Sequence, residues 1–146
     1  MMILCPHFLI DIMKNLVIIG AGGMGRTIFD VARESIGYGI EYTIKGFIDD
    51  NLSALDGFED YPPMLGTISH YLPEVDDVFT FSIGGESRRV CIEYLMERNA
   101  KFINIVHSTA RIGSNVRMGE GNVIGAFTSL GADCSIGSYN MIQSYT

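Results

Sequence analysis

A glycine-rich segment near the start of the chain has the residue types and spacing of a phosphate-binding turn. Residues 20–25 read GAGGMG and fit the pattern G-x-G-x-x-G. Glycine tolerates positive φ and lets backbone N–H groups approach a ligand closely, and a helix that starts there adds the positive end of its dipole. The segment therefore predicts a diphosphate site at which Gly22 and Gly23 face the ligand.

Two acidic residues follow the second predicted strand at a place where a ribose could bind. Asp49 and Asp50 stand some 24 residues after the last glycine of the turn. In dinucleotide-binding folds, an acidic side chain at this position accepts hydrogen bonds from ribose hydroxyls. Aspartate is equally common in solvated turns and at helix N-caps. Both interpretations, ribose ligand and turn residue, stay open.

A second glycine pair repeats the arrangement of the first turn. Gly84-Gly85 ends the third predicted strand and precedes a helix. Because parallel strands end at the same edge of a sheet, Gly84 is expected to face the same crevice as the first turn. Arg88 and Arg89 begin the helix, where one of them could contact a phosphate or both could simply be solvated.

Strands before these turns and helices after them are predicted from the hydrophobic pattern. Short apolar runs indicate buried strands, and apolar residues spaced by three and four indicate helices. Strands are predicted at 16–19, 42–48, 78–83 and 102–106, helices directly after 20–25, at 87–99 and briefly at 68–72, and a loop at 51–63. This order predicts an α/β fold with a small Rossmann-like parallel sheet.

From residue 112 onward the hydrophobic period changes to six. An aliphatic residue recurs at each step, followed by glycine at the first five, and a small or medium residue stands four positions later. The aliphatic positions are Ile112, Met118, Ile124, Leu130, Ile136 and Ile142. Such a period predicts a hexapeptide β-helix, in which three hexads form one triangular coil around stacked aliphatic side chains. Residues 108–146 hold about two coils.

Composition narrows the function classes. The net charge of −7 argues against nucleic acid and anionic membrane surfaces as partners, because both need clustered Lys and Arg. No apolar run reaches the length of a membrane span. The three cysteines lack C-x-x-C spacing and His partners, which predicts reduced thiols of a cytoplasmic protein and no metal site. They are Cys5, Cys91 and Cys134.

The first twelve residues are apolar but lack the basic segment and small-residue cleavage site of a signal peptide. We expect natural translation to begin at Met13, which leads directly into the first strand. Residues 1–12 are then an extension that does not belong to the native structure.

In combination, these segments resemble the NeuD/PglD-like sugar acetyltransferases. The resemblance runs from Met13 to Thr146 and rests on NLVIIGAGGMGRTIFDVARE, GFIDDN, SIGGESRR, FINIVHSTARIG and the hexads. It implies a Rossmann-like domain, residues 13–107, that binds a UDP-sugar or sugar acceptor, followed by a left-handed β-helix that forms homotrimers. It also implies acetyl-CoA as the donor. The positions that match the family's acceptor site are Gly22, Gly23, Met24, Asp49, Asp50 and Gly84.

Two departures from the family concern the reaction itself. Met24 stands where some members have a polar residue, often histidine, which bears on the identity of the acceptor. The family's general base is a histidine in the coil after Thr146, so this sequence matches the family only up to that coil. His7, His70 and His107 do not match that position, and His107 is expected to have a structural role at a turn. We therefore expect little turnover, with no catalytic residue assigned.

Two other functions remain compatible with the sequence. One is a non-catalytic module that binds nucleotide-sugars. The other is a small NAD-binding domain, suggested by GAGGMG and the acidic residues. The short α/β region and the attached hexads count against NAD.

Overall fold

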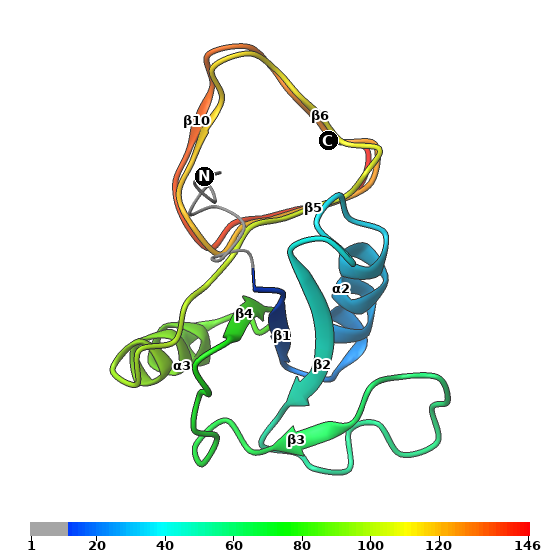
Figure 1. Ribbon diagram of the computed structural model, residues 1–146, viewed down its shortest axis with the longest axis vertical. Helices are drawn as coiled ribbons and strands as arrows, with labels where there is room; N and C mark the ends of the chain where they lie inside the picture. Colours follow the sequence, from blue (N-terminus) through cyan, green and yellow to red (C-terminus); the bar gives the residue numbers. More distant parts are fainter. Residues whose placement is uncertain (1–11) are drawn as a thin grey trace, which may run out of the picture.

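Residues 12–146 are described by the computed structural model of the chain, which has a small parallel sheet, a helix on each face of the sheet and a three-sided coil beside them (Figure 1). Residues 1–11, which form nearly all of the predicted extension and include Cys5 and His7, lie outside the described part. Within residues 12–146, no helix has both the length and the apolar character that a bilayer span requires.

The sheet has four strands, all parallel. Their order is β3 (Met64–Gly66), β2 (Tyr42–Ile48), β1 (Lys14–Ile19) and β4 (Asp77–Phe81). The central strand β1 is fully buried from Leu16 to Ile19 because both faces of the sheet are covered, as is typical of parallel sheets. The strands predicted at 16–19, 42–48 and 78–83 are therefore confirmed in place and direction.

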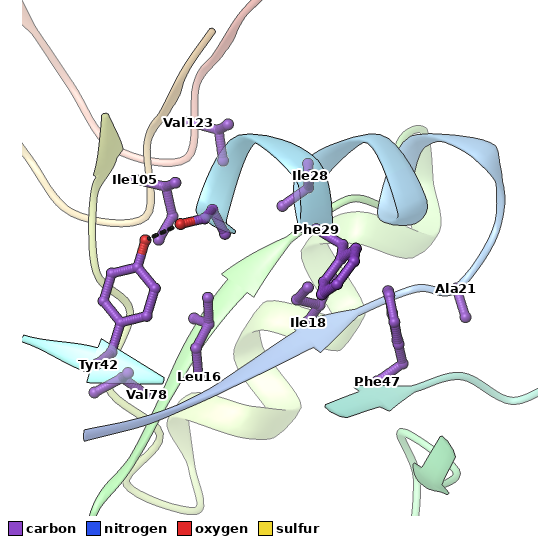
Figure 2. Packing of buried hydrophobic residues seen from close by; sticks show 11 residues of the cluster. Leu16, Ile18, Ala21, Ile28, Phe29, Tyr42, Phe47, Val78, Ile105 and Val123 are labelled. Atoms are coloured by element: carbon purple, nitrogen blue, oxygen red, sulfur yellow. Dashed lines mark hydrogen bonds between the residues drawn. The ribbon is translucent and has the colours of Figure 1, made fainter. Parts of the chain in front are cut away.

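One helix covers each face of this sheet. Alternate residues of a strand point to opposite faces. Ile18 packs in one apolar cluster with Ile28 of α2 (Gly23–Arg33), whereas Ile19 packs in another with Leu95 of α3 (Glu86–Met96). Figure 2 shows the first cluster, where Ile28 and Phe29 of α2 lie over β1. α3 starts directly after the second glycine pair, as predicted, whereas α2 already starts at Gly23, inside the first glycine turn.

The coil is built from strands of two residues each, β5 to β11. They are Ile105–Val106, Arg111–Ile112, Arg117–Met118, Val123–Ile124, Ser129–Leu130, Ser135–Ile136 and Met141–Ile142. Parallel pairing joins residues 18 positions apart, such as Arg111 with Ser129 and Val123 with Met141. Three hexads per turn are thus present, and Figure 1 shows the three-sided path that they follow.

The coil and the α/β layers share one apolar cluster. Ile105 and Val123 from the coil pack with Ile28 and other residues of α2 and β1. Beside this contact, the buried His107 shares a hydrogen bond of 2.6 Å between its Nε2 and the Glu34 carboxylate, at the end of α2. Its Nδ1 accepts a hydrogen bond from the backbone N–H of Thr109, so the neutral ring carries its proton on Nε2. His107 holds α2 against the coil.

Two predicted elements differ from the structure. The prediction of a short helix at 68–72 was wrong, because residues 68–70 form a turn. This turn follows β3, a strand that the sequence did not predict. The segment 102–106 does not form one strand of the sheet. Phe102 makes a single parallel bridge to Phe79, while Ile105 and Val106 pair with β8 of the coil.

Candidate functional site

The first glycine turn lies at the carboxyl end of β1, where two of its glycines are required by packing. Gly20 has φ of +96°, which only glycine adopts easily. A Cβ at Gly25 would overlap the carbonyl oxygen of Gly20 and stand 2.7 Å from its carbonyl carbon. The absence of both side chains lets α2 start directly against the end of β1.

Gly22 and Gly23 have a different environment, because they face open space. No atom lies within 4 Å of a Cβ at Gly22, and only an Arg26 nitrogen, at 3.9 Å, approaches one at Gly23. Gly22 is the N-cap of α2, and no side chain caps the first N–H groups of that helix. The first turn of α2 therefore presents unpaired N–H donors and the positive end of the helix dipole at an open surface.

The second glycine pair lies next to the first turn. Gly84 and Gly85 follow β4, the neighbour of β1, and no atom lies within 4 Å of a Cβ at either. Gly85 is the N-cap of α3, again without a side-chain cap. The Ser82 hydroxyl donates to the Ile19 carbonyl at 2.6 Å, which ties the two strand ends together. The structure thus brings both glycine turns to one edge, as the sequence predicted.

The acidic pair is engaged with the backbone of the same region. One carboxylate oxygen of Asp49 accepts a hydrogen bond from the Ala21 N–H at 2.8 Å, and the other accepts from the Asn51 N–H at 2.8 Å. Asp50 accepts from the Ile68 N–H at 3.1 Å. Only the bond to Asn51 is the local contact of a turn residue, whereas the bonds to Ala21 and Ile68 join segments that are far apart in the chain. A ribose contact by either residue stays a prediction.

Replacing Asp49 by alanine should lower the free energy of unfolding by about 2 kcal/mol, because two backbone donors lose a charged acceptor. Asp50→Ala is the matched control. It removes a single hydrogen bond, which the exposed Asp50 carboxylate accepts. The free energy of unfolding should fall by about 1 kcal/mol or less. Urea unfolding of the two variants and the native chain measures both values. Equal losses would contradict the role given to Asp49.

Sequence reasoning missed Arg26, one turn into α2. Its Nη1 donates to the Ala21 carbonyl at 2.9 Å, and its guanidinium lies over the Phe58 ring, 4.0 Å from the ring centre. Both backbone groups of Ala21 are therefore engaged by side chains, its N–H by Asp49 and its C=O by Arg26. Only the position of Arg26 in the first turn after the glycines could have indicated it.

A cavity of about 240 Å³ lies between α2 and the coil. Met24, which is 39% exposed, lines it at the start of the helix. The remaining lining residues of α2 are Thr27, Ile28 and Val31, and those of the coil are Val123, Gly125, Met141, Ile142, Gln143 and Ser144. The sequence did not predict that these two segments lie together, because they are about 100 residues apart. Within residues 12–146, no group of three His, Cys, Asp or Glu side chains is arranged to hold a metal ion.

Comparison with known proteins identifies similar chains. The profile of the PglD N-terminal domain matches residues 15–95. The UDP-N-acetylbacillosamine N-acetyltransferase of Bacillus subtilis (strain 168) is 30% identical over 117 residues, which cover 77% of this chain and 51% of that protein. The chain thus spans about half the length of the curated relative that it matches.

Solved structures with the same fold include two acetyltransferases. One is a histidine-to-asparagine mutant of perosamine N-acetyltransferase from Caulobacter crescentus, in complex with CoA and GDP-perosamine. It has a TM-score of 0.71 and 22% identity, covering 90% of this chain and 60% of its own. The other is the acetyltransferase domain of PglB from Neisseria gonorrhoeae FA1090, with a TM-score of 0.64 and 22% identity, covering 90% and 71%.

Proposed function

The chain belongs to the PglD-like family. We propose that it functions in acetyl-CoA-dependent acetyl transfer to a sugar, in particular to a UDP-linked amino sugar. The bacillosamine N-acetyltransferase relative and the perosamine N-acetyltransferase neighbour support this reaction class. Acetyl-CoA is the second substrate, and it enters the proposal through the family.

The pair of glycine turns at one edge of the sheet is the observation that carries this proposal. Gly22, Gly23 and Gly84 leave open space at two neighbouring helix starts, neither of which is capped by a side chain. Backbone N–H groups at helix starts bind the phosphates of nucleotides in many proteins. In a chain with a net charge of −7, such N–H groups offer an anionic ligand a local site of favourable potential.

The cavity between α2 and the coil has the position expected for the sugar. Met24 lines this cavity and directly follows Gly22 and Gly23. A sugar linked to a diphosphate at the glycine turn can therefore extend towards the coil. Ile28, Val31 and Ile142 offer apolar contacts, and Gln143 and Ser144 offer polar ones. Pockets of this kind, mostly apolar with a few polar groups, are usual for small ligands.

The proposed reaction is a direct acyl transfer. The acceptor nitrogen or oxygen attacks the carbonyl carbon of the acetyl thioester, a C–N or C–O bond forms, and the C–S bond breaks. The acceptor loses a proton to a general base, and the CoA sulfur leaves as a thiolate that is protonated afterwards. None of the residues 12–146 is assigned as that base.

We further propose that the coil is the start of a left-handed β-helix, and that this β-helix forms homotrimers. The 18-residue parallel pairing of β6 with β9, β7 with β10 and β8 with β11 supports the β-helix. The acceptor-binding domain then begins at Met13, and the β-helix includes β5, since Ile105 and Val106 pair with β8; the boundary lies before residue 105 and not at 107 as the sequence predicted. A non-catalytic module for nucleotide-sugars would use the same acceptor site.

Thermal unfolding with added nucleotides tests the proposed acceptor. UDP-N-acetylglucosamine or UDP at 100 times its Kd should stabilise the chain by about 2.7 kcal/mol, since a ligand of the folded state contributes RT ln(1 + [L]/Kd). For a chain of this size we expect a rise in Tm of roughly 5–10 °C. NADH at the same concentration is the control and should have no effect. A shift with NADH and none with UDP compounds would contradict the proposal.

A further inference from the structure

Arg26 has no carboxylate partner among the described residues, whereas Arg33 of α2 and Arg89 of α3 have one; Arg88 of α3 also lacks one. Arg33 pairs with Asp30 at 3.0 Å, and Arg89 pairs with Glu93 at 2.9 Å. For Arg26, no carboxylate of residues 12–146 comes within ion-pair distance. Its charge is nevertheless half-buried beside the first glycine turn.

The guanidinium of Arg26 is held in a fixed place. Its flat face lies over Phe58 at 4.0 Å, and its Nη1 donates to the Ala21 carbonyl at 2.9 Å. Stacking on an aromatic ring and one backbone hydrogen bond restrict a side chain that otherwise has many rotamers. Little rotamer entropy then remains to be lost when the guanidinium binds an anion.

The second terminal nitrogen points to the open side of the turn. Nη2 is 3.9 Å from the position of a Cβ on Gly23, and it donates to no acceptor among the described residues. The guanidinium thus has free N–H groups next to the uncapped start of α2. Planar N–H groups of arginine match the oxygens of a phosphate, often through two parallel hydrogen bonds.

We propose that Arg26 binds the diphosphate of the acceptor and thereby selects a nucleotide-diphosphate-linked sugar over a free sugar. This inference rests on the proposed acceptor site. Among the described residues, Arg26 is the cationic side chain that hydrogen-bonds to the first glycine turn, where the Asp49 carboxylate is also bound. Backbone N–H groups alone provide partial charges, whereas Arg26 provides a full positive charge in a chain with a net charge of −7. A free sugar carries no phosphate that could bind to Arg26.

The alternative is that Arg26 only fastens the loop around Phe58 to the turn. A fastening role predicts that its loss weakens binding of every ligand equally, because the whole turn becomes less ordered. A phosphate-binding role predicts a loss that depends on the phosphates of the ligand. Binding experiments with ligands that differ only in phosphate separate the two.

The experiment compares Arg26→Met with Arg33→Met by calorimetric titration of the full chain with UDP. Arg33 is the matched control because it lies in the same helix, stacks over Phe29 at 5.0 Å and has one polar partner, but at the other end of α2. Uridine is titrated in parallel at millimolar concentration and followed by NMR. Its Kd reports binding of the nucleoside without phosphate. Arg26→Lys keeps the positive charge but replaces the planar guanidinium by an ammonium group.

We expect Arg26→Met to raise the Kd for UDP about tenfold and to leave the Kd for uridine unchanged, since a charged hydrogen bond is lost only with phosphate. Arg26→Lys should recover part of the affinity, and Arg33→Met should match the native chain. Equal losses for UDP and uridine, or native UDP binding by Arg26→Met, would overturn the role of Arg26. Failure of the native chain to bind UDP would instead overturn the proposed acceptor itself.

Discussion

Replacing Gly25 by alanine should destabilise the chain by about 3 kcal/mol or more, which corresponds to a fall in Tm of roughly 10 °C. The methyl group would overlap the Gly20 carbonyl oxygen and stand 3.1 Å from the Ser82 hydroxyl. Backbone atoms cannot rotate away as a flexible side chain can. The start of α2 must therefore move away from the end of β1, which also displaces the N–H groups proposed to bind phosphate.

Gly23→Ala is the matched control for this prediction. It lies two positions earlier in the same turn, and the nearest atom to its new Cβ is at an ordinary contact distance of 3.9 Å. Alanine is also the better helix former, so the free energy of unfolding should change by less than about 0.5 kcal/mol. Urea unfolding of both variants provides the comparison. A Gly25→Ala chain as stable as the native one would show that α2 and β1 are not in such close contact.

Replacing Asp77 should strongly destabilise the chain, because its side chain is fully buried and its carboxylate accepts hydrogen bonds from three donors. Lys45 Nζ lies 2.9 Å from one carboxylate oxygen, while the Tyr71 hydroxyl at 2.6 Å and the Glu74 N–H at 2.9 Å contact the other. Asp77→Ala leaves all three without this partner, although Lys45 keeps Glu74 at 3.4 Å and is 24% exposed. We therefore expect a loss of about 2–3 kcal/mol in the free energy of unfolding, mainly from the donors left unpaired.

Asp76→Asn is the control for the more conservative Asp77→Asn. Asp76 is the neighbouring residue, but its partner Lys14 is 3.5 Å away and both side chains are a third or more exposed. Exposed ion pairs contribute little, so the Asp76 variant should lose less than about 0.5 kcal/mol. Asp77→Asn should lose clearly more in the same urea titration. Equal values for the two variants would refute the buried network.

The pH dependence of stability provides a second test of the same residue. Burial by itself would raise the pKa of Asp77, but hydrogen bonds from Tyr71 and the Glu74 N–H and the charge of Lys45 outweigh it and hold the pKa below its ordinary value. A carboxyl whose pKa is lowered by folding contributes stability above its unfolded pKa of about 3.9, and this contribution is lost as the pH falls through the folded pKa. The difference between native and Asp77→Asn chains should therefore shrink below about pH 4.

The sequence by itself determined the elements whose signals are local. The pattern G-x-G-x-x-G after an apolar run located β1, its turn and α2, because the positive φ of Gly20 and the close contact of Gly25 with the Gly20 carbonyl are local requirements for glycine. The six-residue period predicted the 18-residue pairing of the coil, since a repeat imposes the same geometry at every step. Both glycine turns were predicted at one edge from the parallel order of strands alone.

Only the tertiary structure decided what the polar side chains contact. Asp49 could have faced a ribose or the backbone, and the fold brings the Ala21 N–H, 28 residues away, within 2.8 Å of it. Arg26 meets Phe58 only because the loop after β2 folds back over the start of α2. The strand β3 is three residues long and carries no period of its own, so pairing with β2 defines it.

The cavity next to Met24 has the same origin. Its walls come from α2 and from residues 141–144, and they meet because Ile105 and Val123 of the coil pack with α2 in one apolar cluster. Hydrophobic packing is non-directional, so an apolar residue indicates that it is buried without indicating against what. For this chain, local patterns therefore predicted most of the elements and the edge at which the candidate site lies. The contacts that shape the site depend on segments that only folding brings together.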